Sequence, residues 1–254
     1  MDRRWALRAA AVTAVGVAAG CTTPSAETGT ATGPPAPAGN PASPSPSASA
    51  TPGRQLPPEV VRGPADRPNV ALTFHGQGDP GLVRQLLAEL DRGGARVTVL
   101  AVGSWLDQQP ELAKRILDGG HELGNHTQNH GDIAKMAPAK AFTEINFCAM
   151  RLARLTGSIG TWFRPSATQH STPMIREQAA RVGYPTCLSY DVDSLDYQDP
   201  GAAAVARTTL DLVRNGSIVS LHFGHSGTVA AMPALLDGLR QRGLRPVTMT
   251  ELVS

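Results

Sequence analysis

Two histidines four residues apart, His126 and His130, are the side chains with the clearest chemical potential. They lie in the stretch GHELGNHTQNH, residues 120–130. On a helical turn this spacing places both imidazoles on one face, where they can bind the same metal ion. Two surface histidines often have this spacing by chance, so the pair by itself makes a metal site a hypothesis that other residues must complete.

Other reactive side chains directly follow four runs of residues that favour β-structure. His75 follows NVALTF, Arg164 follows TWF, the group Asp191, Asp193 and Asp196 follows TCLSY, and His222 follows SIVSL. Such runs are typical of β-strands. Active sites of parallel α/β proteins gather at the carboxyl ends of the strands. The positions of these side chains therefore predict one shared site.

The elements that must position these side chains alternate between strand and helix patterns. Leu82, Leu86 and Leu90 recur on one helix face, and a Gly-Gly pair at residues 93–94 ends that pattern. Further helices are expected at residues 110–117, 139–155, 173–182, 202–213 and 229–240. Strands are expected at residues 69–74, 96–102, 161–164, 186–190, 217–222 and 246–249. This alternation predicts an α/β fold with parallel strands and helices outside, either as an open sheet or as a barrel.

Several polar residues are expected to have structural roles. We expect His121 to bond backbone at a turn, and Glu144 and Arg151 to lie on a solvated helix face. Cys148 and Cys187 can form a disulfide across a long loop or remain as two buried thiols, and both alternatives stay open.

The N-terminus has the pattern of an export signal. Arg3 and Arg4 precede an apolar run at residues 9–19 that is too short to span a bilayer as a helix. Small residues then precede Cys21, which resembles the lipobox of bacterial lipoproteins, where the cysteine carries the lipid. We therefore expect residues 1–21 to be a lipoprotein signal peptide, and the protein to be lipid-anchored in the cell membrane, outside the cytoplasm and facing the cell wall. The arginine pair leaves Sec and twin-arginine export both open.

Composition separates a tether from a globular part. Residues 22–58 consist largely of Pro, Ser, Thr, Ala and Gly, which cannot bury enough apolar surface to offset their ordering entropy. We expect this segment to be a disordered tether, and residues 59–254 to form one catalytic domain. The net charge of +2 does not indicate a nucleic-acid partner, and we expect a monomer.

The histidine stretch at residues 120–130 resembles the second motif of the polysaccharide deacetylases, the family 4 carbohydrate esterases with a NodB homology domain. The resemblance extends over residues 69–252. It implies a distorted (β/α) barrel, and it implies that His126 and His130 bind zinc or another divalent metal.

Three further motifs carry the resemblance toward a catalytic site. Phe-Arg-Pro at residues 163–165 resembles the third motif, which implies that Arg164 orients the catalytic base. Asp-Ser-Leu-Asp-Tyr at residues 193–197 resembles the fourth, so Asp196 would support the catalytic histidine. The stretch SIVSLH at residues 217–222 resembles the fifth, which implies that His222 is the general acid.

The first motif departs from the family pattern. The family has Thr-Phe-Asp-Asp-Gly, in which the first Asp is the base and the second is a metal ligand, whereas this chain has Thr-Phe-His-Gly-Gln at residues 73–77. Gly76 has no side chain and cannot bind metal, so a third ligand must come from elsewhere. His75 is our first choice because imidazole suits zinc. One of its nitrogens cannot both bind metal and accept a proton, so its roles as ligand and base compete. The alternative third ligands are Asp79, His170 and His225.

These observations lead to one principal function and two alternatives. The principal hypothesis is a metal-dependent hydrolase that removes N-acetyl groups from sugars of a cell-wall or extracellular polysaccharide. The first alternative is a lipoprotein that keeps the fold, has lost catalysis and binds glycan. The second is an esterase or amidase of altered specificity, because the changed first motif can reshape the pocket.

Overall fold

A computed structural model describes residues 56–254, and the predicted signal peptide, Cys21 and nearly all of the predicted tether lie outside this range. In chain order the strands are β1 (Glu59–Val60), β2 (Asn69–Gly76), β3 (Thr98–Ala101), β4 (Glu122–Asn125), β5 (Cys187–Leu188), β6 (Val192–Asp193), β7 (Ile218–His222) and β8 (Arg245–Val247). The α-helices are α1 (Pro80–Arg92), α2 (Gly103–Gln108), α3 (Pro110–Asp118), α4 (Pro138–Thr156), α5 (Pro173–Val182), α6 (Ala202–Leu212), α7 (Ser226–Gln241) and α8 (Met249–Val253). Two 3₁₀ turns, η1 (Ile133–Lys135) and η2 (Asp196–Gln198), lie in the connecting loops.

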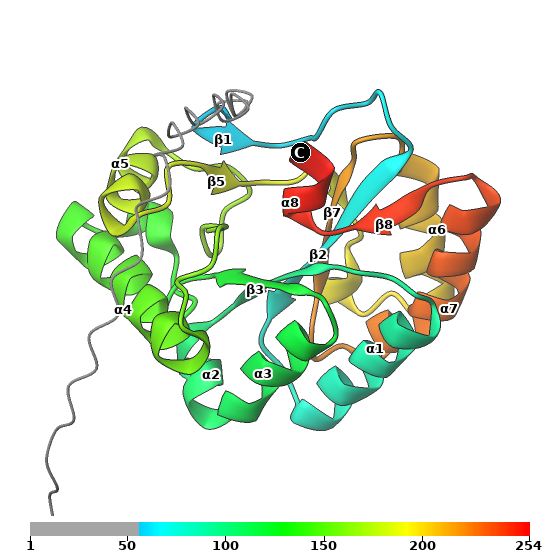
Figure 1. Ribbon diagram of the computed structural model, residues 1–254, viewed down its shortest axis with the longest axis horizontal. Helices are drawn as coiled ribbons and strands as arrows, with labels where there is room; N and C mark the ends of the chain where they lie inside the picture. The colour runs from blue at the N-terminus through cyan, green and yellow to red at the C-terminus, as the bar shows by residue number, and fades with distance from the viewer. Residues whose placement is uncertain (1–55) are drawn as a thin grey trace, which may run out of the picture. The chain divides into compact units, whose positions relative to one another are not determined.

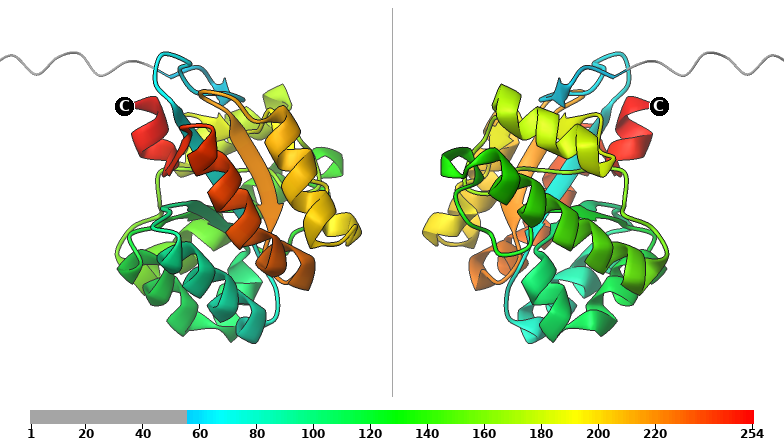
Figure 2. Two further views of the ribbon diagram at one scale, coloured as in Figure 1. Left: turned by 90° about the vertical axis from the view of Figure 1, so that its right-hand side faces the viewer. Right: turned by 90° about the vertical axis from the view of Figure 1, so that its left-hand side faces the viewer.

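The strands form an incomplete parallel barrel with helices around it (Figures 1 and 2). A six-stranded sheet has the order β4-β3-β2-β7-β6, with β8 also pairing with β2, and all of these pairs are parallel. β5 pairs with β1 in a separate two-stranded sheet. Single bridges from Phe163 to Asn125 and to Cys187 connect the two sheets. The predicted parallel α/β fold is therefore confirmed.

β2 is the central strand, and its sequence explains why it is buried on both faces. Val70, Leu72 and Phe74 belong to the main hydrophobic core, into which α1 and α7 also pack their apolar faces. Ala71 lies on the opposite face, in the cluster inside the barrel. A continuous apolar run is what a parallel strand covered on both sides requires. His75 follows at the carboxyl end of this strand, on the same face as Ala71.

Several predicted elements differ from the structure at their boundaries. The strand expected at residues 161–164 contributes only the bridge at Phe163, and Pro165, which has no N–H, follows shortly after it. The strand expected at residues 246–249 ends at Val247, because Met249 already begins α8. The sequence patterns also missed α2, which is one short turn-and-a-half of helix, and β4.

β4 was missed because its sequence, Glu-Leu-Gly-Asn, has no β-branched or aromatic residue. A close backbone approach decides its conformation instead. A Cβ atom at Gly124 would lie 2.5 Å from the carbonyl oxygen of Trp162, so only glycine lets the two segments meet. Asn125 then donates its backbone N–H to that same oxygen at 2.8 Å.

The two cysteines are buried free thiols in different clusters. Cys148 lies on α4 in the main core, and Cys187 lies on β5 in a smaller cluster beside α4 and α5. Burial raises the pKa of Cys148 to about 12 and that of Cys187 to about 11, so neither thiol is reactive at neutral pH. The structure therefore contains two buried free thiols, and Cys148 and Cys187 do not form a disulfide.

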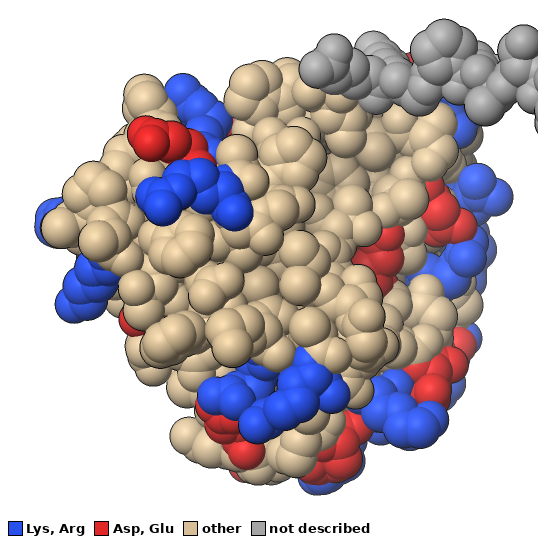
Figure 3. Space-filling model, turned by 60° about the vertical axis from the view of Figure 1, so that its left-hand side comes forward, with Lys and Arg blue, Asp and Glu red and all other residues tan. Residues whose placement is uncertain are grey.

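Charged side chains are sparse on the face shown in Figure 3, where acidic and basic groups lie next to one another at the margins of a broad uncharged area. Several charged side chains form exposed ion pairs, such as Arg84–Glu111 and Lys135–Asp132. Among residues 56–254, no helix combines the length and the apolar character that a bilayer crossing requires.

The close approach at Gly124 gives a testable consequence for stability. Gly124→Ala should lower the free energy of unfolding by about 2–3 kcal/mol, because the added methyl group overlaps a backbone atom that cannot move aside. Gly94→Ala is the matched control: its φ is +62° but the space around it is open, so it should cost only about 1 kcal/mol. Urea unfolding measures both values. Equal losses of stability in the two variants would show that the close approach to Trp162 does not exclude a side chain at position 124.

Candidate metal centre and active site

Parallel register brings His75 and His222 together. β2 and β7 pair with His75 opposite His222, at the carboxyl ends of both strands. Residues paired in this way point to the same face of a sheet, and the centroids of the two imidazole rings lie 4.3 Å apart. His75 and His222, which follow different strands in the sequence, therefore lie side by side, as their positions predicted.

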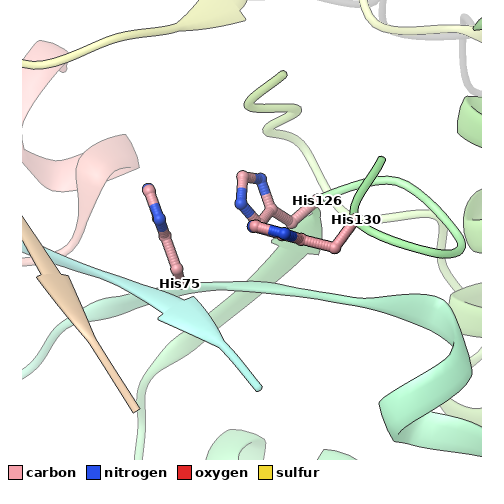
Figure 4. Close-up of side chains that lie close together, drawn as sticks. All are labelled: His75, His126 and His130. Atoms are coloured by element: carbon pink, nitrogen blue, oxygen red, sulfur yellow. The ribbon is translucent and has the colours of Figure 1, made fainter. Parts of the chain in front are cut away.

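His75, His126 and His130 form a cluster at this end of the strands (Figure 4). One ring nitrogen from each histidine lies within 4.8 Å of the corresponding nitrogens of the other two. His75 approaches from the end of β2, whereas His126 and His130 approach from the loop that follows β4. This is the only group among residues 56–254 in which three such ligand atoms meet.

The loop that carries His126 and His130 is not helical. The four-residue spacing predicts a helical turn, but Thr127 and His130 have left-handed backbone conformations, with φ values of 66° and 56°. Side-chain hydrogen bonds hold this turn: Thr127 N–H donates to Asn125 Oδ1 at 2.9 Å, and His130 N–H donates to Thr127 Oγ1 at 3.2 Å. The two rings therefore converge through an irregular turn rather than along a helix face.

The tautomer of His126 follows from its hydrogen bond. Nδ1 lies 2.9 Å from the backbone carbonyl oxygen of Arg164, which can only accept, so Nδ1 must carry the proton. Nε2 of a neutral ring then has a free lone pair. Metal-binding histidines are commonly held by such a bond from the other ring nitrogen.

Two buried nitrogen atoms in the cluster have no hydrogen-bond partner within the described residues: Nε2 of His75 and Nε2 of His126. Burial, together with the neighbouring histidines and Arg164, holds the pKa of both residues well below the ordinary value of 6.5. Burial also lowers the pKa of His130. Neutral imidazoles with unused lone pairs fit a divalent metal, and three ligands with an open position suit a catalytic zinc site.

His222 and Asp196 form a second unit beside the cluster. Nδ1 of His222 donates to Oδ1 of Asp196 at 2.7 Å, while the backbone N–H of His222 and the hydroxyl of Thr228 donate to Oδ2 at 2.8 and 2.7 Å. Burial alone would raise the pKa of Asp196, but these hydrogen bonds outweigh it and the pKa lies below its ordinary value. The carboxylate is therefore ionised and fixes the ring of His222.

Arg164 is fully buried beneath the cluster. Its Nη2 donates to Thr73 Oγ1 at 2.8 Å and to the carbonyl oxygen of Ser189 at 3.0 Å. Its Nη1 has no partner, and no carboxylate among residues 56–254 forms an ion pair with this guanidinium. Burial lowers the pKa of Arg164 to about 9, which still leaves the side chain charged at neutral pH.

The other candidates for a third ligand are engaged elsewhere. Asp79 caps α1 by accepting from the N–H groups of Gly81 and Leu82. His170 lies 3.5 Å from Glu59, and His225 bonds Asp199 at 2.8 Å. His75 is therefore the residue that the structure places beside His126 and His130.

Position 76 has no space for a side chain. A Cβ atom at Gly76 would lie 2.8 Å from Val99 Cγ1 and 3.0 Å from Ala101 Cα. The residue points into the packed layer between β2 and β3, so a carboxylate at this position would need a different backbone at the end of β2.

The structure confirms the predicted structural role of His121 but not the predicted solvent exposure of Glu144. His121 accepts the backbone N–H of Val97 at 3.3 Å, which confirms its structural role. The expectation of a solvated Glu144 was wrong: its exposed fraction is 8%, and its carboxylate accepts two hydrogen bonds from Asn129. Sequence periodicity did not predict the burial of Glu144, because this residue faces the irregular loop of residues 126–130, which has no periodic sequence pattern. Arg151 is half-buried and pairs with Asp107.

Comparison with known proteins adds independent findings on family and fold. A sequence profile described as polysaccharide deacetylase matches residues 62–187. The peptidoglycan-N-acetylglucosamine deacetylase of Bacillus cereus is 31% identical over 188 residues, which cover 72% of this chain and 87% of that protein. Protein YlxY of Bacillus subtilis is 25% identical over 197 residues, and the matched region covers 78% of this chain but only 61% of that relative.

A solved structure has the same fold as this chain. The CE4 family pseudoenzyme of Bacillus anthracis superposes with a TM-score of 0.74 at 21% identity, covering 78% of this chain and 70% of that one. At this identity the likeness concerns the fold alone.

The lowered histidine pKa values predict how the metal-free protein responds to acid. Below about pH 6.5 the unfolded chain binds protons at His75, His126 and His130 that the folded chain does not, so stability falls as pH decreases. Each histidine contributes a slope of up to about 1.4 kcal/mol per pH unit. Urea unfolding of the EDTA-treated protein at pH 7.5 and 5.5 measures this loss, and His75→Asn should reduce it. An unchanged slope in the variant would contradict the lowered pKa.

The unpaired guanidinium predicts the effect of a carboxylate at position 75. Thr73 bonds Arg164 from the same face of β2, and the charge of Arg164 already lowers the pKa of His75. His75→Asp should therefore be more stable than the isosteric His75→Asn, by about 1.5–3 kcal/mol at pH 7. Because the arginine lowers the carboxyl pKa, this difference should persist well below pH 7 and disappear as the pH falls through that pKa. Equal unfolding free energies of the two variants at pH 7 would show that Arg164 does not reach position 75.

Proposed function

Because the chain belongs to the polysaccharide deacetylase family, we propose that it is a metal-dependent hydrolase that removes N-acetyl groups from sugars of a cell-wall or extracellular polysaccharide. The observation that carries this proposal is the placement of His222, held by Asp196, beside a cluster of three neutral histidines. An acid for the leaving amine and a set of metal ligands then lie at the same end of the barrel.

The proposed metal ligands are His75, His126 and His130, and the proposed metal is zinc or another divalent ion. A bound zinc ion would act as a Lewis acid that polarises the acetamide carbonyl. Arg164 supports the ligands in two ways: its backbone carbonyl orients His126, and its charge favours a neutral His75. We assign His75 to metal binding rather than proton transfer, because its Nε2 is buried and unpaired.

The proposed general acid is His222. Its Nδ1 proton is committed to Asp196, so proton transfer to the sugar amine takes place from Nε2. The ionised carboxylate stabilises the protonated ring and holds its orientation, while Thr228 fixes the carboxylate itself. This arrangement matches the roles of acid and supporting acid in the family motifs.

Loss of catalysis with retention of glycan binding is the second candidate function. The specific observation in its favour is the first motif, in which His75 and Gly76 replace both acidic residues and position 76 has no space for a ligand. The similar fold from Bacillus anthracis is described as a pseudoenzyme, so the fold itself does not distinguish the two candidates.

The proposed location rests on the N-terminal sequence. Lipid attachment at Cys21 would place the protein in the cell membrane facing the cell wall, with residues 22–58 as the spacer. In this position the substrate would be an N-acetylated wall or extracellular glycan.

Acetate release tests the proposal. The zinc-loaded protein is incubated with peptidoglycan, chitooligosaccharides and a simple acetyl ester, and released acetate is measured. His222→Ala should reduce the rate about 10²- to 10⁴-fold while zinc binding persists, because only the proton donor is lost. His126→Ala should abolish both release and zinc binding.

The outcomes separate the candidate functions. Release of acetate from glycans with these variant effects supports the deacetylase, whereas a preference for the ester favours altered specificity. Glycan binding without release, in a protein that does not hold zinc, would favour the catalytically inactive lipoprotein. A His222→Ala variant with unchanged rate would remove the proposed acid.

A further inference from the structure

Glu144 is a buried carboxylate on α4 without a cationic partner. Only 8% of the residue is exposed. Arg151, two turns along the same helix, pairs with Asp107 instead, and no ion pair to Glu144 occurs within residues 56–254. Burying a carboxylate is costly unless hydrogen bonds compensate for the lost water. The partners of Glu144 therefore indicate what this side chain does.

Both carboxylate oxygens of Glu144 bond a single residue, Asn129. Oε2 accepts the backbone N–H of Asn129 at 2.8 Å, and Oε1 accepts its side-chain Nδ2 at 2.8 Å. The two bonds fix the position and the orientation of the peptide at Asn129. Hydrogen bonds to an ionised acceptor are roughly twice as strong as neutral ones. Asn129 directly precedes His130 in the chain.

Within residues 56–254, His130 is held through its backbone N–H, which donates to Thr127 Oγ1 at 3.2 Å, and no hydrogen bond holds its ring. His75 is fixed in the ladder of β2, and the ring of His126 is fixed by the carbonyl oxygen of Arg164. His130 lies on an exposed part of the loop with a φ of 56°, a conformation that costs energy for a non-glycine residue. Its backbone must therefore be fixed by its neighbours.

We propose that Glu144 is a positioning residue that fixes the backbone before His130 and thereby aims its imidazole at the metal. This inference rests on the metal centre of the proposed function. The carboxylate is required because both of its oxygens accept from N–H groups. A glutamine in the same place would keep one acceptor and turn an NH₂ group toward a donor.

Cobalt binding by the full-length protein tests this role without relying on catalysis. The dissociation constant for Co²⁺ is measured by titration of the visible absorption bands of the bound ion. Loss of an outer support typically weakens metal binding about 10- to 100-fold, and Glu144→Gln should fall in this range. Glu177→Gln on α5 is the matched control, because Glu177 is exposed and lies outside the cluster, and its affinity should equal that of the wild type.

A second variant keeps the test independent of the folding of Glu144→Gln. Asn129→Ala removes only the bond from the side chain and should weaken cobalt binding less than Glu144→Gln. The double variant should bind about as weakly as Glu144→Gln alone, because both changes act on one contact. A merely structural contribution of Glu144 would instead lower the urea unfolding free energy and leave the cobalt affinity unchanged.

The outcomes distinguish this role from the proposed function. Equal cobalt affinities for the wild type, Glu144→Gln and Asn129→Ala would overturn the positioning role and leave the metal centre intact. A wild-type protein that binds no cobalt would overturn both. Weakened binding in both variants, with the control unchanged, would establish the role.

Discussion

The guanidinium of Arg164 connects the segments that frame the site. Its side chain donates to Thr73 on β2 and to the carbonyl oxygen of Ser189 directly after β5, while its backbone N–H donates to Asn125 at the end of β4. Its carbonyl oxygen orients His126. A charged group in this position must be satisfied or the fold loses stability. One buried cation therefore connects β2, the end of β4 and the segment after β5, and its carbonyl oxygen orients the ring of His126.

The buried charge of Arg164 bears directly on the altered first motif, because it lies close enough to His75 to lower the pKa of that residue. A neutral histidine at position 75 leaves the buried arginine without an anionic partner, and it supplies a third imidazole to the cluster. Gly76 continues β2 and packs against β3, where no ligand fits. The same two replacements thus remove the acidic groups of the family pattern and assemble a site of three histidines. In the proposed metal centre all three ligands would be neutral, whereas the family pattern includes a carboxylate ligand.

The site also depends on a loop without regular structure. His126 and His130 converge because the side chains of Thr127, Asn129 and Ser166 form hydrogen bonds in and around the turn. Glu144 reaches this turn from α4, 15 residues further along the chain than Asn129. The spacing of His126 and His130 correctly predicted that their rings lie close together. The predicted helical turn was wrong, because residues with left-handed backbone conformations bring the rings together instead.

The sequence by itself determined the alternation of strands and helices and the order of the reactive residues along them. Apolar periodicity and glycine stops are local signals, so the helices at residues 110–118 and 173–182 agree with their patterns. Only the tertiary structure decided that His75, rather than Asp79, His170 or His225, joins the histidine pair. The parallel register of β2 with β3 and of β3 with β4 sets that choice, and register arises from packing between residues far apart in the chain.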